Sequence, residues 1–249
     1  MNTVSKKNLS YTAILCTYNA ENTVETAVNS ILKQTIKPKE IIIVDDSSSD
    51  KTIDILSGYL QKHSGIKLIR LLKNVGQSVA RNLATKNASG DILIFFDDDD
   101  ESLPERASEH LAMQESSQVS YVSSRKVYSD SYSLEYINES ITLTPNTSEW
   151  VIKLTTGVSN PHLNNLWVPC STCSINRSLF NEIDGFSDDF RRLEDVDLFL
   201  KSTLMNASVS WSDKILVVRN NSFGLDKGGF IDAIYERKLL EKYKNFMSR

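Results

Sequence analysis

The stretch from Ile92 to Asp100, ILIFFDDDD, joins a continuous apolar run directly to four carboxylates. A short, uninterrupted apolar run is typical of a strand that is buried on both faces, as in a parallel sheet. In open sheets of this kind, ligands bind beyond the carboxyl ends of the strands. The sequence therefore predicts that Asp97–Asp100 lie at the ligand-binding edge of a parallel sheet.

The residues before this stretch repeat a unit of strand, polar loop and helix. Apolar runs predict strands at Tyr11–Cys16, Ile41–Val44 and Ile66–Leu72, and apolar side chains at helical spacing follow each of them. Asn22 and Glu25 resemble a capping pair for the first helix. Alternating strands and helices are typical of parallel βαβ units with right-handed crossovers. We therefore expect an α/β, Rossmann-like fold in which a mostly parallel central sheet carries helices on both faces.

The second half of the chain has a weaker pattern. Ser102-Leu103-Pro104-Glu105 resembles a capping box and predicts a helix that starts there and runs toward Met113. Further elements are expected as strands at Val119–Ser123 and Cys170–Asn176, and as helices near Trp150–Leu154, at Ser178–Ile183 and at Val196–Leu204.

The composition excludes several classes of function. The 28 Lys and Arg are outnumbered by 32 Asp and Glu, so the chain lacks the positive charge of a nucleic-acid-binding protein. Its 9 glycines form neither G-x-G-x-x-G nor the G-x-x-x-x-G-K-[ST] phosphate loop. Three cysteines give no even disulfide framework, and Met1–Ser10 lacks the apolar stretch of a secretory signal, so we expect a cytoplasmic protein.

The four carboxylates Asp97–Asp100 predict a bound divalent cation. Like charges a few ångströms apart repel one another and raise each other's pKa unless a cation lies between them. Oxygen ligands suit Mg²⁺ or Mn²⁺, above all where substrate phosphates complete the shell. The alternatives are a solvated acidic turn and negative charge at the start of the next helix. The D-D-x-x-D motif of prenyl-diphosphate enzymes is disfavoured because it lies on helices, whereas a strand precedes these residues.

Other candidate residues each have a structural alternative. Asp46 ends the second strand, where its carboxylate can accept a hydrogen bond from a base or cap the next helix. Arg81, one turn into the helix after Gly76, can meet a phosphate or form a surface ion pair. Cys170 and Cys173 have metal-ligand spacing, but no second such pair exists in the sequence, so packing is favoured.

Several ordered motifs resemble family 2 glycosyltransferases of the GT-A fold, over roughly residues 11–204. The motifs are Thr17-Tyr18-Asn19, Val44–Thr52, Asn74-Val75-Gly76 with Ala80-Arg81-Asn82, Gly90-Asp91 and Phe96–Asp100. Farther on, Asp184-Gly185-Phe186 resembles the family's G-G-F turn, and Glu194-Asp195 resembles its E-D motif.

The resemblance implies an inverting, metal-dependent enzyme that moves one sugar from a nucleotide-sugar donor, usually a UDP-sugar, to a hydroxyl. The acceptor would be a glycan or a lipid-linked sugar in surface polysaccharide synthesis. Asp195 becomes the general base with support from Glu194, and Mn²⁺ or Mg²⁺ is bound by Asp99 directly and by Asp97. The residues implied in nucleotide binding are Thr17, Tyr18, Asn19, Glu21, Asp46 (facing the base), Gly76, Arg81, Asp97 and Asp98.

The expected organisation is an N-terminal tail (1–10), a GT-A glycosyltransferase domain (11–225) and a C-terminal basic amphipathic helix (226–249). Within the domain, residues 11–101 would bind the nucleotide and residues 102–225 the acceptor. From Lys227 onward, six basic and three acidic residues lie among apolar ones. This pattern predicts peripheral contact of 227–249 with the inner face of the cell membrane, or packing on the domain or on a second subunit of a homodimer.

Two features depart from the family pattern. Several members carry a metal-binding His after the E-D helix, where this chain has Val218-Arg219-Asn220-Asn221. The Q-x-x-R-W motif of processive synthases is also absent from the sequence, which favours one transfer per encounter. Two alternatives remain: a non-catalytic nucleotide or glycan binding module, and a sugar-phosphate nucleotidyltransferase, which needs a Gly-rich basic loop unlike Thr17-Tyr18-Asn19.

Overall fold

A computed structural model of the chain describes residues 8–128, 131–133, 168–220 and 229–247. The first half contains β1 (Tyr11–Thr17), α1 (Val24–Leu32), β2 (Glu40–Asp45), α2 (Thr52–Lys62), β3 (Ile66–Arg70), α3 (Gln77–Lys86), β4 (Ile92–Asp97), β5 (Asp100–Ser102) and α4 (Arg106–Met113). The second half contains β6 (Val119–Tyr128), β7 (Ser131–Ser133), the 3-10 turn η1 (Cys170–Thr172), β8 (Cys173–Asn176), α6 (Arg177–Glu182), α7 (Glu194–Leu204), β9 (Val209–Asn220) and α8 (Gly229–Met247).

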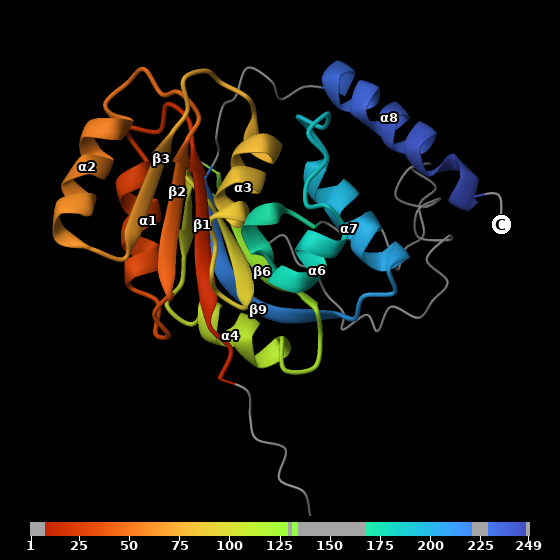
Figure 1. The fold of residues 1–249 in the computed structure, drawn as a ribbon, viewed down its shortest axis with the longest axis horizontal. Helices are drawn as coiled ribbons and strands as arrows, with labels where there is room; N and C mark the ends of the chain where they lie inside the picture. Colours follow the sequence, from red (N-terminus) through yellow and green to blue (C-terminus); the bar gives the residue numbers. More distant parts are fainter. Residues whose placement is uncertain (1–7, 129–130, 134–167, 221–228, 248–249) are drawn as a thin grey trace, which may run out of the picture.

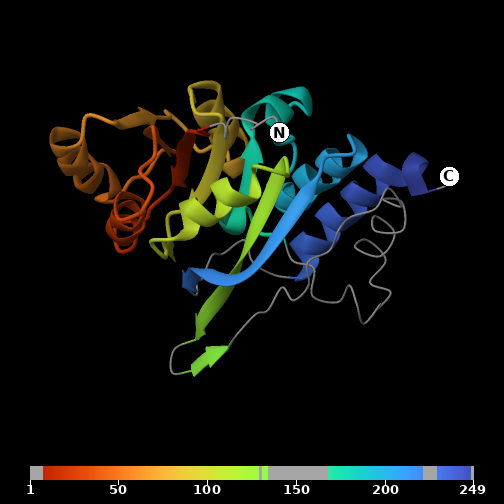
Figure 2. The same ribbon diagram turned by 90° about the horizontal axis from the view of Figure 1, so that it is seen from below.

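Within the described ranges, nine strands form one sheet in the order β3-β2-β1-β4-β8-β6-β9-β5, with β7 paired to β6. The strands β3, β2, β1 and β4 are parallel, as the βαβ pattern predicts. β8 joins β4 antiparallel and so brings the second half of the chain into the same sheet. The long strands β6 and β9 lie side by side (Figure 2).

The sheet has a hydrophobic core on each face, because its central strands alternate their apolar side chains. Ile14, Ile42 and Phe95 pack on one face together with α3, α6, α7 and α8. Leu15 and Ile43 pack on the other face with α1, α2 and α4. Figure 1 shows α1 and α2 on the opposite side of the sheet from α3, α6 and α7, with α8 outside α7. The predicted α/β fold with helices on both faces is confirmed.

Three local predictions are wrong. Ser102 ends β5, whose residues pair with β9, and α4 begins at Arg106 without a side-chain cap. Asn22 does not cap α1, which begins after Thr23 with no side-chain capping bond. Only the second part of Cys170–Asn176 is a strand. At Ser102, pairing with the distant strand β9 outweighs a capping signal of about 1 kcal/mol.

Some expectations concern residues outside the described ranges. The helix near Trp150–Leu154 and most of the N-terminal tail belong to this group. Among the described helices, none is both long enough and apolar enough to cross a bilayer.

The turn at Gly185 can be tested by substitution, because Gly185 has φ +52° and an added Cβ would lie 2.6 Å from Asn82 Oδ1. We expect Gly185→Ala to lower the free energy of unfolding by about 1–3 kcal/mol in urea titrations. Gly58→Ala in α2 is the matched control, since a Cβ there has no neighbour within 4 Å. It should leave stability unchanged or raise it by up to about 1 kcal/mol. Equal losses in both variants would contradict the assignment of strain to Gly185.

Candidate active site

The carboxyl ends of β1, β2 and β4 bring the predicted site residues to one edge of the sheet. Thr17 lies in register with Asp45, and Cys16 lies in register with Asp97. The loop after β1 is tied to the loop after β4, because the Tyr18 N–H donates to Asp98 Oδ2 over 3.0 Å. This is the edge at which ligands of parallel sheets bind.

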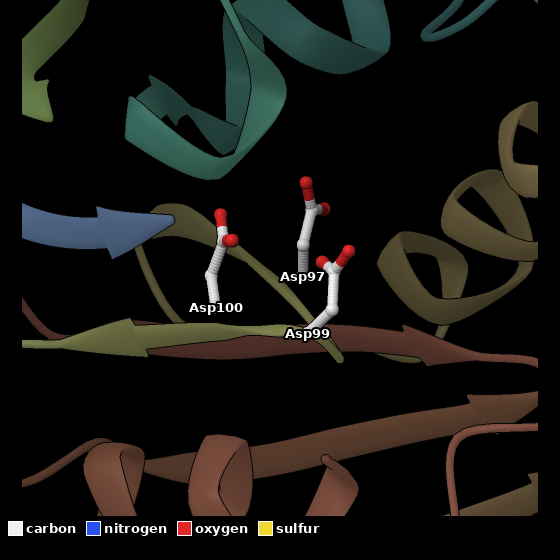
Figure 3. Close-up of side chains that lie close together, drawn as sticks. All are labelled: Asp97, Asp99 and Asp100. Atoms are coloured by element: carbon white, nitrogen blue, oxygen red, sulfur yellow. The ribbon is translucent and has the colours of Figure 1, made fainter. Parts of the chain in front are cut away.

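Three of the four aspartates point to the same side of the chain (Figure 3). One oxygen from each of Asp97, Asp99 and Asp100 lies within 4.8 Å of the others. Burial, followed by the charges of Asp99 and Asp97, raises the pKa of Asp98 to about 7, and similar causes raise that of Asp100 to about 8. This crowding fits a hard divalent cation, which takes carboxylate oxygens and offsets their repulsion.

Asp100 is a candidate ligand that the sequence interpretation did not single out. It is only 6% exposed, and among the described residues its Oδ2 accepts no hydrogen bond. Arg219 forms an ion pair with it, and its Nε lies 3.8 Å from Asp100 Oδ2. The run of four aspartates was the available signal, but pairing of β5 with β9 decides which of them join.

The end of β9 lies beside this acidic cluster. Asn220 at the end of β9 donates from Nδ2 to the Asp99 carbonyl oxygen over 2.7 Å. Asn220 therefore braces the loop of the aspartates from the end of β9.

Asp46 fastens the loop that precedes α3. Its carboxylate accepts the N–H groups of Val75 and Gly76, both over 2.8 Å, and is buried. Gly76 caps α3 with φ +92°, a conformation that favours glycine. Each carboxylate oxygen keeps a further lone pair for a ligand, so Asp46 can hold the loop and a base at the same time.

The residues after β1 divide into two groups. Asn19 and Glu21 brace the neighbouring loop, because Asn19 Oδ1 accepts the Ser49 N–H over 2.9 Å and Glu21 Oε2 accepts the Lys51 N–H over 3.0 Å. The ring of Tyr18 is 50% exposed at the same edge and is available to a ligand.

Arg81 connects the two motifs that lie farthest apart in the sequence. Its guanidinium donates to Asp97 Oδ1 over 2.8 Å and to Glu194 Oε1 over 2.9 Å, and the side chain is 3% exposed. Burial acts to lower the pKa of Arg81, but the neighbouring acidic groups outweigh it and hold the pKa well above its usual value. The structure therefore places Glu194 and the acidic cluster on either side of one cation.

Asp195 opens α7 next to Glu194. Its Oδ1 accepts the Val196 N–H over 2.8 Å. Burial and the adjacent Glu194 charge raise the pKa of Asp195 to about 7. A carboxylate with a pKa near neutrality is suited to accept a proton during a reaction.

With this geometry in place, comparison with known proteins decides the family. The family model described as "Glycosyl transferase family 2" matches residues 12–184. The chain belongs to this family. The matched residues include the carboxyl ends of β1, β2 and β4 and all four aspartates, Asp97–Asp100.

Two relatives are named for the transfer of a sugar, one to a diphosphoundecaprenol-linked GlcNAc and the other to cholesterol. A UDP-Glc:α-D-GlcNAc-diphosphoundecaprenol β-1,3-glucosyltransferase, WfgD of Escherichia coli, is 30% identical over 197 residues, which are 79% of this chain and 70% of that protein. A cholesterol galactosyltransferase of Borreliella burgdorferi is 37% identical over 87 residues, 35% of this chain but only 24% of the relative's length.

The solved structures include the same fold with a bound donor. Residues 1–349 of S. aureus TarS in complex with UDP-GlcNAc superpose with a TM-score of 0.68 at 25% identity. The match covers 90% of this chain and 61% of the TarS chain. The predicted GT-A architecture of family 2 is thus confirmed.

The bridge formed by Arg81 can be tested through stability. Arg81→Ala leaves two carboxylates without their shared buried cation, so we expect the free energy of unfolding to fall by about 2–3 kcal/mol. The control is Arg237→Ala, which removes an i,i+4 ion pair with Glu241. In that pair the Arg237 side chain is 82% exposed and the Glu241 side chain is 63% exposed. That change should cost less than about 0.5 kcal/mol in the same urea titration. A loss for Arg81→Ala as small as that of the control would show that the bridge is not a structural tie.

Proposed function

We propose that this protein is an inverting, metal-dependent glycosyltransferase that moves one sugar from a UDP-sugar to a hydroxyl of a glycan or lipid-linked acceptor in surface polysaccharide synthesis. The observation that carries the proposal is the convergence of the acidic cluster and the Glu194-Asp195 pair on Arg81. Two comparisons support it. The name of WfgD specifies UDP-Glc and a diphosphoundecaprenol-linked acceptor, and TarS is solved in complex with UDP-GlcNAc.

The nucleotide would lie on the edge formed by β1, β2 and β4. Tyr18 offers a half-exposed ring against which a base can stack, and Asp46 offers a carboxylate lone pair to a ring N–H. Thr17 and Gly76 form the backbone on either side, and Asn19 and Glu21 hold the loops in place. Arg81 would act through Asp97, which it orients, because its side chain is only 3% exposed and donates to the Asp97 carboxylate.

The acidic cluster would bind Mn²⁺ or Mg²⁺ through Asp99 and Asp97, and Asp100 is close enough to share it. A bound divalent cation acts as a Lewis acid and stabilises the charge of a departing diphosphate. Asp98 is tied to the Tyr18 N–H and so contributes by fixing the loop.

Asp195 is the proposed general base. The acceptor hydroxyl must lose its proton as its oxygen bonds to the anomeric carbon, and a carboxylate at hydrogen-bond range takes that proton. Activation of the attacking oxygen from the face opposite the leaving group produces inversion, by analogy with inverting glycosidases. Glu194, fixed by Arg81, orients the start of α7.

A lipid-linked acceptor would place the protein at the cytoplasmic side of a membrane. The exposed side of α8, which includes Ile234, Arg237 and Lys244, is the surface that we propose for peripheral contact with anionic lipid. Formation of a homodimer through the same side is the competing arrangement.

Donor binding should depend on metal through Asp99. We expect UDP-sugars with Mn²⁺ to raise the melting temperature, because a ligand that binds the native state stabilises it, and we expect Asp99→Ala to lose the Mn²⁺-dependent part of the shift. Asp213→Ala, at an exposed aspartate on β9, should keep it. Slow release of UDP by the wild type identifies an enzyme, whereas a shift without UDP release indicates a binding module. Mn²⁺-independent binding in the wild type would contradict the metal site.

The role of Asp195 can be tested by its pH dependence. A base with a pKa raised to about 7 is protonated and inactive at lower pH, so the transfer rate should rise through about pH 7 and level off above it. Asp195→Asn should retain nucleotide affinity, lose about 10²-fold or more in rate, and show no such rise. Wild-type turnover in Asp195→Asn would remove Asp195 from this role.

A further inference from the structure

The segment from Ser187 to Asp197 forms a loop that is closed at its base. Ser187 Oγ donates to Asp197 Oδ2 over 2.7 Å, and the Asp197 N–H closes the first turn of α7 by donating to the Leu193 carbonyl oxygen over 2.9 Å. Glu194 and Asp195 lie between these closing contacts. Fixing Asp197 therefore fixes the turn that carries the proposed base.

Asp197 is held by two side chains of α8. The carboxylate is 0% exposed, and its Oδ1 accepts Lys242 Nζ over 2.6 Å and the Tyr243 hydroxyl over 2.7 Å. Lys242 Nζ also donates to Ser187 Oγ over 2.7 Å, so one ammonium group joins both ends of the loop. A buried carboxylate with this many donors is strongly stabilised in one position.

Further contacts of α8 hold the middle of the loop. Lys238 Nζ lies 2.7 Å from Asp189 Oδ2, and the ammonium groups of Lys238 and Lys242 each lie 5.1 Å from the centre of the Phe190 ring. Leu239 and Tyr243, both on α8, are buried in the core between α8 and the rest of the domain. Two of the basic residues that predicted membrane contact are therefore turned toward the domain.

The opposite side of the same loop touches the candidate active site. The Phe190 carbonyl oxygen accepts a hydrogen bond from the Ser78 hydroxyl over 2.5 Å. A Cβ added at Gly76 would lie 3.6 Å from Cγ of Arg191. Glu194 pairs with Arg81. The loop is thus fixed by α8 on one side and forms part of the site's wall on the other.

We propose that Asp197, Lys242 and Tyr243 form a positioning clamp, through which α8 sets the place of Glu194 and Asp195 relative to the acidic cluster. This inference rests on the proposed function, because its effect is on the transfer step. Most of the proposed nucleotide-binding residues lie at the ends of β1, β2 and β4 or in the loops that follow them. The bonds of the clamp are made to the 187–197 loop, so loss of the clamp reduces kcat and spares UDP affinity.

The test is the double variant Lys242→Met with Tyr243→Phe, which removes the donors and keeps most of the side-chain volume. We expect kcat for sugar transfer to fall at least about tenfold, since small misplacements of a catalytic group are costly. The Kd for UDP with Mn²⁺, measured by calorimetry, should change less than about twofold. Tyr243→Phe alone should give a smaller loss in the same direction.

Two controls separate positioning from general destabilisation. Leu111→Ala weakens the core on the other face of the sheet, and Asp213→Ala alters an exposed residue of β9. Both should keep kcat at a temperature where the protein is folded. An unchanged kcat in the double variant, or an equal loss of kcat in Leu111→Ala at a matched melting temperature, would overturn the clamp.

A second measurement keeps the clamp independent of the proposed reaction. Hydrogen exchange at the Val196 and Asp197 amides should accelerate in the double variant and remain slow in Leu111→Ala. If the wild type transfers no sugar, but exchange at these amides is faster in the double variant than in Leu111→Ala, the proposed function fails and the clamp stands. If exchange at these amides is the same in all variants, the clamp itself is wrong.

Discussion

The site depends on one buried guanidinium that is shared by two carboxylates. Arg81 stands on α3, Asp97 ends β4 and Glu194 begins α7, so the ion pair joins three elements from both halves of the chain. A buried arginine is stable only if its charge is compensated, and a planar guanidinium can meet two carboxylates in fixed directions. This cation therefore offsets the repulsion between the two acidic motifs.

A second buried arginine lies behind the acidic edge on the other face of the sheet. Arg106 is 0% exposed, donates to the Phe95 carbonyl oxygen over 2.6 Å and lies 4.4 Å from the centre of the Phe96 ring. Burial lowers its pKa to about 10, which leaves it charged at neutral pH. The negative charge at the end of β4 is therefore balanced from both cores by arginines, before any ligand is considered.

The sequence predicts local features of this protein well and their partners poorly. Apolar strands that end in polar residues are sufficient to place Asp46 and Asp97 at one edge, since parallel strands share their carboxyl ends. The capping pattern Ser102-Leu103-Pro104-Glu105 predicts the start of a helix, yet the backbone of Ser102 pairs with Val217 in β9. Glu194, one of the two partners of Arg81, is 113 residues away in the sequence, and no spacing rule reaches that far. The apolar face of α8 is visible in the sequence, but the sequence does not reveal that Lys242 and Tyr243 meet a buried aspartate.

The way in which Asp46 holds its loop also bears on how such a pocket changes during evolution. Both of its contacts are to main-chain N–H groups, which every residue except proline provides. Val75 can therefore be substituted without loss of these two hydrogen bonds, whereas substitution of Asp46 removes both and releases the loop before α3. Related proteins can in this way differ in the side chains around a nucleotide-sugar and still share the same backbone conformation of this loop.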